Sequence, residues 1–262
     1  MTPPTLADRL ALVDDGADAF APAEPVEGPH VFGGLLVAHA LGAATATVAP
    51  ERAAHSLHAS FVQAGAGGAP LRYEVERTRD GASFTTRRVV ARQPHGVVLV
   101  LTAGFHEPEP GLDHETAAVP GIPGPDGLGP GRYDNPLVES RDVPVGEPSE
   151  PPLARRAWFR VRDQLGDDEA VHLQALAFLS DFGMTRAARE PHAGLDDDAR
   201  RQSVSLDHSL WFHRPVRADR WLLSELVPVA TGRGRGLATG AIRAEDGSLV
   251  ATVAQEVLLR AR

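Results

Sequence analysis

A short pattern that occurs twice constrains the fold of this chain most. The run His55-Ser56-Leu57 returns as His208-Ser209-Leu210, and each copy is followed by a β-like stretch with a glycine turn, at Gly96 and at Gly247. Two weakly similar halves of this kind predict a duplicated fold. The repeat also provides a test, because each candidate catalytic residue of one half can be compared with the matching residue of the other.

The composition is that of a globular protein and excludes several kinds of chemistry. Hydrophobic residues make up 42% of the 262 residues, and the net charge of −9 disfavours a nucleic-acid binder, which usually carries a basic surface. The absence of Cys excludes thiol nucleophiles, disulfides and thiolate metal sites. All 26 basic residues are Arg, so Schiff-base catalysis and a P-loop lysine are also excluded.

Neither a membrane span nor a secretion signal is expected from the sequence. No run of 18 apolar residues occurs, and such a run is what a membrane-spanning helix requires. The segment Met1 to Asp8 lacks the basic and apolar regions of a signal peptide. We therefore expect a cytoplasmic protein.

Each half of the chain combines an apolar helix with strands. Leu35 to Val48 carries almost no charge and predicts a buried helix. Ala170 to Leu179 predicts a second one, which begins after the acidic run Asp167 to Glu169. Partial alternation and β-branched residues predict strands at Leu57–Val62, Leu71–Arg77, Ser83–Gln93, Val97–His106, Ala154–Val161, Ser203–Phe212, Trp221–Val229, Gly236–Ala244 and Leu249–Leu259.

The segment from Glu107 to Pro152 separates the two halves. It holds 11 of the 22 prolines, which remove backbone donors, so we expect no regular element in it. Its length predicts that part of it packs on the surface. The predicted domains are an N-terminal hotdog at 1–106, a linker at 107–152 and a C-terminal hotdog at 153–262. The fold class is α+β, a double hotdog in which two antiparallel sheets, each wrapped around a long apolar helix, form one continuous sheet.

Four segments in this order resemble the acyl-CoA thioesterase II family and span nearly the whole chain outside the linker. The run from Leu206 to Pro215, with Asp207-His208 and Arg214-Pro215 inside it, is the most specific. The others are Val31 to Gly34, the group of His55 to His58 with Arg79 to Phe84 and Arg87 to Val89, and Val253 to Glu256.

The resemblance implies an activity and a set of site residues. Members of the family hydrolyse fatty acyl-CoA to free acid and CoA, with a water held by an Asp, a Thr or Ser, and a Gln. Matched to the family's motifs, these are Asp181 after the second apolar helix, Ser205 before the Asp-His pair and Gln255 in the last strand. Ser205 replaces the commoner Thr and lacks the methyl group that restricts its rotamer. Leu35 replaces a polar residue of the family.

The implied chemistry is consistent with the residues themselves. Asp181 lies near a predicted helix C-terminus with Gly183 as the expected stop, and burial at the negative end of a helix makes a carboxylate a stronger base. Ser205 and Gln255 can hydrogen-bond a water without titrating. Backbone N–H groups at Gly33 and Gly34, where a helix begins, are candidates to receive the oxyanion. No metal or redox cofactor is expected, since CoA is part of the substrate.

Each candidate also has an ordinary structural interpretation. Asp181 alone fits a helix-end turn, and Ser205 a small polar strand residue. Gln255 shares a strand face with Val253 and Val257, so this face is either exposed or buries the amide for a reason. His208 is interpreted as structural, because His55 matches it in the half without catalytic residues.

The run Gly232 to Gly236 has two interpretations. A Gly-x-Gly-x-Gly run between strands is more often a turn or bulge than a phosphate loop. Arg233 and Arg235 within it are nevertheless candidates to bind the phosphates of CoA.

Two other functions remain open. A hotdog enoyl-CoA hydratase or dehydratase needs an Asp/His dyad, but the adjacent side chains of Asp207 and His208 would diverge on a strand. A non-catalytic acyl-CoA-binding module would keep the fold, and the replacement of Thr by Ser205 is the feature that favours it. The resemblance further implies that whole chains associate.

Alignment of the halves predicts one active site per chain. Ser205 falls on Arg52 when the His-Ser-Leu runs are aligned, and Gln255 falls on Gly104 when the glycine turns are aligned. The helix Leu35 to Val48 contains no carboxylate that matches Asp181.

Overall fold

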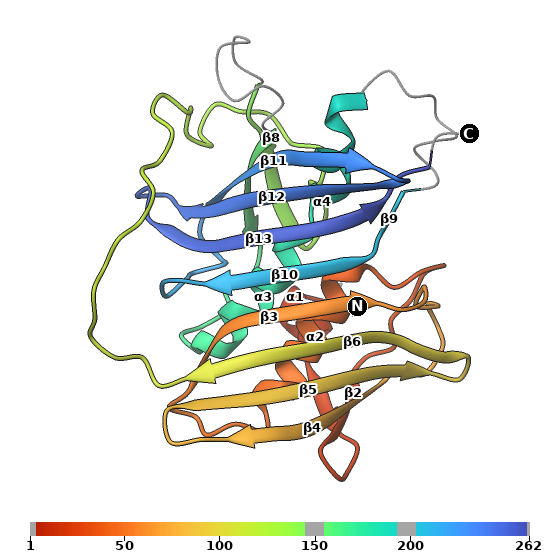
Figure 1. Cartoon of the computed structure of the whole chain (residues 1–262). Coiled ribbons are helices and arrows are strands. Elements are labelled where there is room, and N and C mark those ends of the chain that lie inside the picture. Colours follow the sequence, from red (N-terminus) through yellow and green to blue (C-terminus); the bar gives the residue numbers. More distant parts are fainter. Residues whose placement is uncertain (1–3, 145–154, 193–202, 261–262) are drawn as a thin grey trace. The chain divides into compact units, whose positions relative to one another are not determined.

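The computed structural model describes residues 4–144, 155–192 and 203–260, and the chain divides into two compact units (Figure 1). The first unit holds Met1–His114 together with Asp163–Leu179, and the second holds Glu115–Arg162 together with Ser180–Arg262. Each unit is built on antiparallel strands. The expected continuity of the two sheets and the predicted domain limits stay predictions.

The sheet of the first unit has the strand order β1-β2-β4-β5-β6-β3, with antiparallel neighbours throughout. The strands predicted between Leu57 and His106 are confirmed, whereas β1 and β2 were not expected. The bounds are β1 Leu12–Asp14, β2 Ala19–Pro22, β3 Ala53–Phe61, β4 Arg72–Asp80, β5 Phe84–Gln93 and β6 Gly96–His106.

Helix α2 (Gly33–Thr45) confirms the first predicted apolar helix. Its residues from Gly34 to Leu41 are all buried, and it packs against β4, β5, β6 and β3, behind the sheet in Figure 1. A short helix α1 (Leu6–Leu10) precedes it and begins with a capping box, in which Thr5 and Asp8 each accept a hydrogen bond from the other's backbone N–H.

Helix α3 (Glu169–Ser180) confirms the second predicted helix. Up to Leu179 it belongs to the first unit, where Gln174 Nε2 donates to the backbone oxygen of Ala38 at 3.3 Å. A Cβ at Gly42 would lie 1.8 Å from Gln174 Nε2, so the glycine allows this close approach of α2 and α3.

The sheet of the second unit has the strand order β10-β13-β12-β11-β8-β7, with β9 paired to β13. The six-residue helix α4 (Met184–Arg189) packs on β11, β12 and β13 and continues into a 3₁₀ turn. The strand bounds are β7 Val138–Asp142, β8 Arg155–Val161, β9 Val204–Ser205, β10 Asp207–Phe212, β11 Leu222–Gly232, β12 Arg235–Ala244 and β13 Leu249–Leu258, and the 3₁₀ turn is Glu190–His192.

The segment predicted as a linker contains a strand and a packed loop. β7 lies inside it and pairs with β8, so the prediction of no regular element there was wrong for residues 138–142. Ile122 and Leu128 pack against a small core that includes Trp158, whose Nε1 donates to the backbone oxygen of Pro123 at 2.9 Å. The prediction that part of this segment packs on the surface is confirmed.

The helices of the described residues are too short or too polar to cross a membrane.

Candidate active site

A chain of hydrogen bonds joins four polar side chains of the second unit. Gln255 Nε2 donates to Ser205 Oγ at 2.8 Å, and Gln255 Oε1 lies 2.6 Å from His208 Nδ1. His208 Nε2 lies 2.8 Å from Ser180 Oγ. Gln255 and His208 are 0% exposed, so the two bonds of His208 are shielded from water. The structure thus brings together Ser205 and Gln255, two of the three side chains implied by the resemblance.

Strand pairing places these side chains. Ser209 pairs with Ala254 in the β10–β13 ladder, so His208 lies opposite Gln255 one residue further along. Further along the same edge of β13 Ser205 pairs with Val257, and its hydroxyl accepts a hydrogen bond from Gln255. The burial pattern of β13 alternates, with Val253, Gln255 and Val257 all buried. Gln255 is therefore an amide on an otherwise apolar, inward face.

The third implied residue, Asp181, directly follows Ser180 at the end of α3. Its carboxyl is buried, with 8% of the residue exposed. The next residue, Phe182, packs its ring on Phe159 and Tyr133 at centroid distances of 5.8 and 5.4 Å. Gly183 then adopts a φ of 87°, in the left-handed region, and confirms the predicted helix stop. The backbone at Asp181 is thus fixed by Ser180 on one side and by an aromatic cluster on the other.

Asp207 and His208 do not form a dyad. The carboxylate Oδ1 of Asp207 accepts a hydrogen bond from the backbone N–H of Glu256 at 2.6 Å, whereas His208 contacts Ser180 and Gln255. Their side chains diverge as predicted for neighbours on a strand. This arrangement disfavours the hydratase alternative, which needs both groups at one site.

The other predicted substrate-binding residues lie elsewhere in the chain. Gly33 and Gly34 form the first turn of α2 in the first unit. Arg233 and Gly234, with φ of 53° and 74°, form the two-residue turn of the β11–β12 hairpin, so the turn interpretation of this glycine run is confirmed. Arg233 is exposed, and Arg235 Nε donates to Glu256 Oε1 at 2.8 Å. A role of these four residues in binding stays a prediction.

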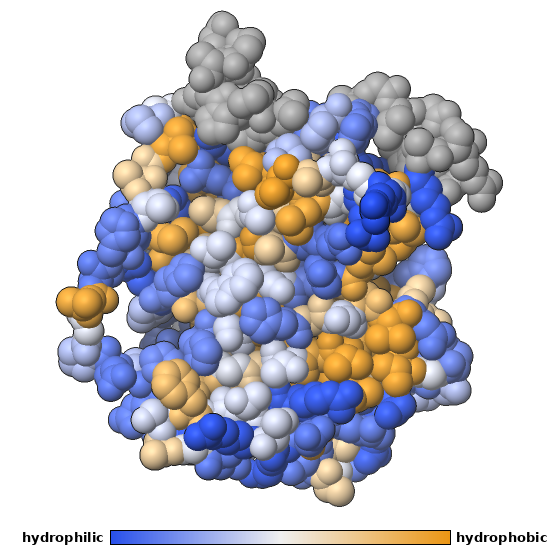
Figure 2. Space-filling view, in the orientation of Figure 1, coloured by the Kyte–Doolittle hydropathy of each residue, from blue (hydrophilic) through white to orange (hydrophobic). Residues whose placement is uncertain are grey.

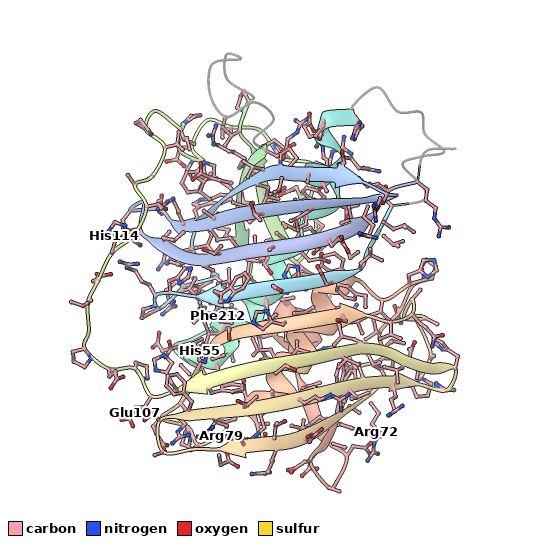
Figure 3. The ribbon with its side chains drawn as sticks, viewed as in Figure 1. His55, Arg72, Arg79, Glu107, His114 and Phe212 are labelled. Carbon is pink, nitrogen blue, oxygen red and sulfur yellow. The ribbon has the colours of Figure 1, made fainter. Side chains whose placement is uncertain are left out.

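Sequence reasoning missed Ser180 and assigned His208 only a structural role. Ser180 directly follows the predicted helix Ala170 to Leu179 and is the last residue of α3. The available signal was a hydroxyl next in sequence to the candidate catalytic carboxylate of Asp181. His208 was paired by the repeat with His55, which is labelled in Figure 3 and lies on β3. The rings of His55 and Phe84 lie 5.7 Å apart, centroid to centroid.

The strand register also changes the match between the halves. Ser56, the counterpart of Ser209, pairs with Gly104, so Gly104 corresponds to Ala254 and Phe105 corresponds to Gln255. The glycine-turn alignment had placed Gln255 on Gly104, and the difference of one residue arises because the two glycines stand at different places in their turns: Gly96 pairs with Gln93, whereas Gly247 lies before the first paired residue of β13, Leu249. Phe105 is fully buried, so the first half has an aromatic ring where the second has its amide.

Comparison with known proteins gives the same family over most of the chain. A model of the acyl-CoA thioesterase N-terminal domain matches residues 22–106, and one of the C-terminal domain matches residues 113–259. Acyl-coenzyme A thioesterase 8 of Homo sapiens is 34% identical over 265 residues, covering 90% of this chain and 82% of that protein.

Comparison with solved structures gives the same family and the hotdog fold. The crystal structure of the acyl-CoA thioesterase II TesB2 from Mycobacterium marinum has a TM-score of 0.86 and 34% identity, covering 98% of this chain and 97% of that chain. A conserved protein of unknown function with a hot dog fold from Alicyclobacillus acidocaldarius, 23% identical, has a TM-score of 0.78 and covers 97% of both chains. The chain belongs to the acyl-CoA thioesterase II family of thioester hydrolases, and its fold is a double hotdog.

Proposed function

We propose that this chain hydrolyses fatty acyl-CoA thioesters to free acid and CoA with a water held by Asp181, Ser205 and Gln255. The observation that carries the proposal is the buried amide of Gln255, which donates to Ser205 Oγ within a network that ends at the residue before Asp181. Buried polar groups of this kind are costly unless they are paired, and they cluster at functional sites. Family membership supports acyl-CoA as the substrate class.

In the proposed reaction one proton is transferred, and a carbon–oxygen bond replaces the carbon–sulfur bond of the thioester. The water oxygen bonds to the thioester carbonyl carbon while a water proton passes to the carboxylate of Asp181, which acts as general base. The carbon–sulfur bond then breaks, and the thiolate of CoA takes up the proton. Gln255 has two amide protons, one of which is donated to Ser205 Oγ, so the second can hydrogen-bond the water. Neither Gln255 nor Ser205 changes its charge during the step.

The test is thiol release from a series of acyl-CoA chain lengths. Asp181→Asn should lower kcat by at least about 100-fold, the usual contribution of a general base. Asp246→Asn is a matched control, because Asp246 lies in the exposed β12–β13 turn and accepts hydrogen bonds from the neighbouring Ser248. Full activity of Asp181→Asn would show that the base is assigned to the wrong residue.

The two alternative functions give different results in the same assay. Hydration of an enoyl-CoA without thiol release would indicate a hydratase. Binding of acyl-CoA without turnover would indicate a binding module.

A further proposal concerns the phosphates of CoA. Arg233 is exposed at a hairpin turn, whereas the guanidinium of Arg235 is paired with Glu256. If Arg233 binds a phosphate, Arg233→Ala should raise KM for acyl-CoA about fivefold, the equivalent of about 1 kcal/mol. KM for the matching acyl-pantetheine, which lacks the nucleotide, should stay unchanged.

Three further expectations are proposed together with the activity. The mechanism requires no metal or redox cofactor, so kcat should survive treatment with a chelator. The protein is expected to reside in the cytoplasm and to self-associate. Figure 2 shows an apolar area on the exposed face of the first unit, over the ends of β3 and β6, which is consistent with self-association. Light scattering with size-exclusion chromatography measures the oligomeric state.

A further inference from the structure

His208 is a fully buried imidazole that the proposed reaction does not use. Both ring nitrogens are hydrogen-bonded, Nδ1 to Gln255 Oε1 at 2.6 Å and Nε2 to Ser180 Oγ at 2.8 Å. Its counterpart in the repeat, His55, has no such partner at the position of Gln255, because Phe105 stands there. The histidine is therefore tied to the amide that only the second half contains.

The two hydrogen bonds define where the protons lie. Because Gln255 Nε2 donates to Ser205, its Oε1 faces His208 and accepts, which requires a proton on Nδ1. In a neutral ring Nε2 then accepts from the hydroxyl of Ser180. Ser180 thus selects the ring tautomer, and the tautomer selects the orientation of the amide.

The alternative amide orientation is disfavoured by the same bonds. Rotation of the Gln255 amide by 180° would place its NH₂ group against the Nδ1–H of His208, with two donors facing each other. It would also turn the amide oxygen, instead of a donor, toward Ser205 and the proposed water. Without a donor at position 208 the two orientations would be close in energy, and only one of them serves the reaction.

We propose that His208, held by Ser180, is a positioning residue that keeps the amide protons of Gln255 directed at Ser205 and the attacking water. This inference rests on the proposed function. His208 contacts neither the substrate nor the water, and its effect is transmitted through one amide. It should therefore change kcat and leave KM for acyl-CoA nearly unchanged.

Two substitutions of His208 test the roles of its two ring nitrogens separately. Asn at position 208 can place its amide nitrogen where Nδ1 lies and keep the donor to Gln255. Gln can place its amide near Nε2 and keep the contact to Ser180, but it removes that donor. We expect His208→Gln to lower kcat about 100-fold, the effect of misplacing a catalytic group by about 1 Å. His208→Asn should retain activity within about tenfold of the wild type.

The control is His213→Gln, because exposed His213 also bonds a hydroxyl of β13, Thr252 Oγ1 at 2.8 Å. It should keep the wild-type kcat. Melting temperatures of both position-208 variants are measured alongside the kinetics. A purely structural role would lower kcat of both in step with their stability, and this result, or an unchanged kcat in His208→Gln, would overturn the proposal.

The same assays distinguish this inference from the proposed function. If Asp181→Asn is inactive while His208→Gln is fully active, only the positioning role fails. If Asp181→Asn is fully active, the assignment of the site itself fails.

Discussion

Ser205 is the residue at which this chain departs from the commoner Thr of its family. Its Oγ accepts from Gln255 Nε2, so Ser205→Ala removes both the proposed contact to water and the acceptor of a buried N–H. We expect kcat to fall about 100-fold, and the unpaired amide to cost about 1–3 kcal/mol of stability. Ser205→Thr keeps the oxygen and restricts its rotamer, so its kcat should equal or exceed that of the wild type.

Thiol release and chemical denaturation of the two variants measure both effects. If Ser205→Ala has the wild-type kcat, the hydroxyl does not hold the water. Because Ala and Thr bracket Ser in size, loss of activity in both would indicate packing rather than hydrogen bonding as the cause.

Candidate site residues were found from the sequence where a sequence motif contains them. They were missed where only a contact in the folded chain reveals their role. Gln255 was recognised as a candidate because an amide on an apolar strand face is unusual. The bond between Ser180 and His208 joins residues 28 positions apart, on a helix end and a strand, and no periodicity encodes such a pair. His208 was misjudged because its repeat partner His55 shares its sequence motif but not its surroundings.

Element-scale prediction followed hydrophobic periodicity. Long strands such as β5, β6 and β12 were found within a residue or two of their ends, whereas β1, β2, β7 and α4 are too short to show a period. The contact of α3 with Ala38 of α2 was also not predictable. A helix that is apolar nearly all round is expected to be buried, but its sequence does not say which elements it contacts.

Gly183 connects α3 to α4 and follows the candidate base by two residues. Its φ of 87° is costly for any residue with a Cβ, so Gly183→Ala should lower stability by about 1–3 kcal/mol. An added Cβ would also lie 3.1 Å from Leu226 Cδ1, which would shift the segment that carries Asp181. We therefore expect kcat to fall as well.

Gly166→Ala is the matched control for Gly183. Gly166 has a φ of 73°, and an added Cβ there would have no neighbour within 4 Å, so the variant should lose similar stability and keep its kcat. Denaturation and thiol release are measured on both variants. Equal kcat values in the two would contradict a role of the α3–α4 junction in positioning Asp181.

His39 on α2 makes the stability of the first unit dependent on pH. Burial lowers the pKa of His39 from 6.5 to about 4, while its Nε2 bonds the backbone oxygen of Arg9 at 2.7 Å and its Nδ1 bonds Tyr73 Oη at 3.1 Å. Between pH 6.5 and 4 the unfolded chain binds a proton at this residue and the folded chain does not. Stability should therefore fall as pH falls through this window, by up to about 3 kcal/mol.

The measurement is urea denaturation at intervals from pH 7 to pH 4. In His39→Gln, which can keep the hydrogen bond to the backbone oxygen of Arg9 without titrating, the loss of stability over this window should be smaller by the same amount. An unchanged pH dependence in the variant would mean that other groups cause the acid sensitivity.

At the scale of the whole molecule, duplication of the fold does not duplicate the site. The first half has Phe105 at the position of Gln255 and Arg52 at the position of Ser205. Arg52 is engaged in the fold, since its guanidinium donates to Thr85 Oγ1 at 2.5 Å and to the backbone oxygen of Ala82 at 2.7 Å. We therefore predict one active site for each chain.

Substitutions at repeat-related positions test this asymmetry. Gln255→Ala should leave about 1% of the wild-type kcat, as expected for loss of a group that holds the water, rather than the half that two equal sites would leave. His55→Gln, at the repeat position of His208, should keep the wild-type kcat, because His55 contacts aromatic rings instead of a catalytic amide. Titration calorimetry with a non-hydrolysable thioether analogue of acyl-CoA should give one bound molecule per chain. Two bound molecules, or half of the activity in Gln255→Ala, would mean that the first half has retained a site built from other residues.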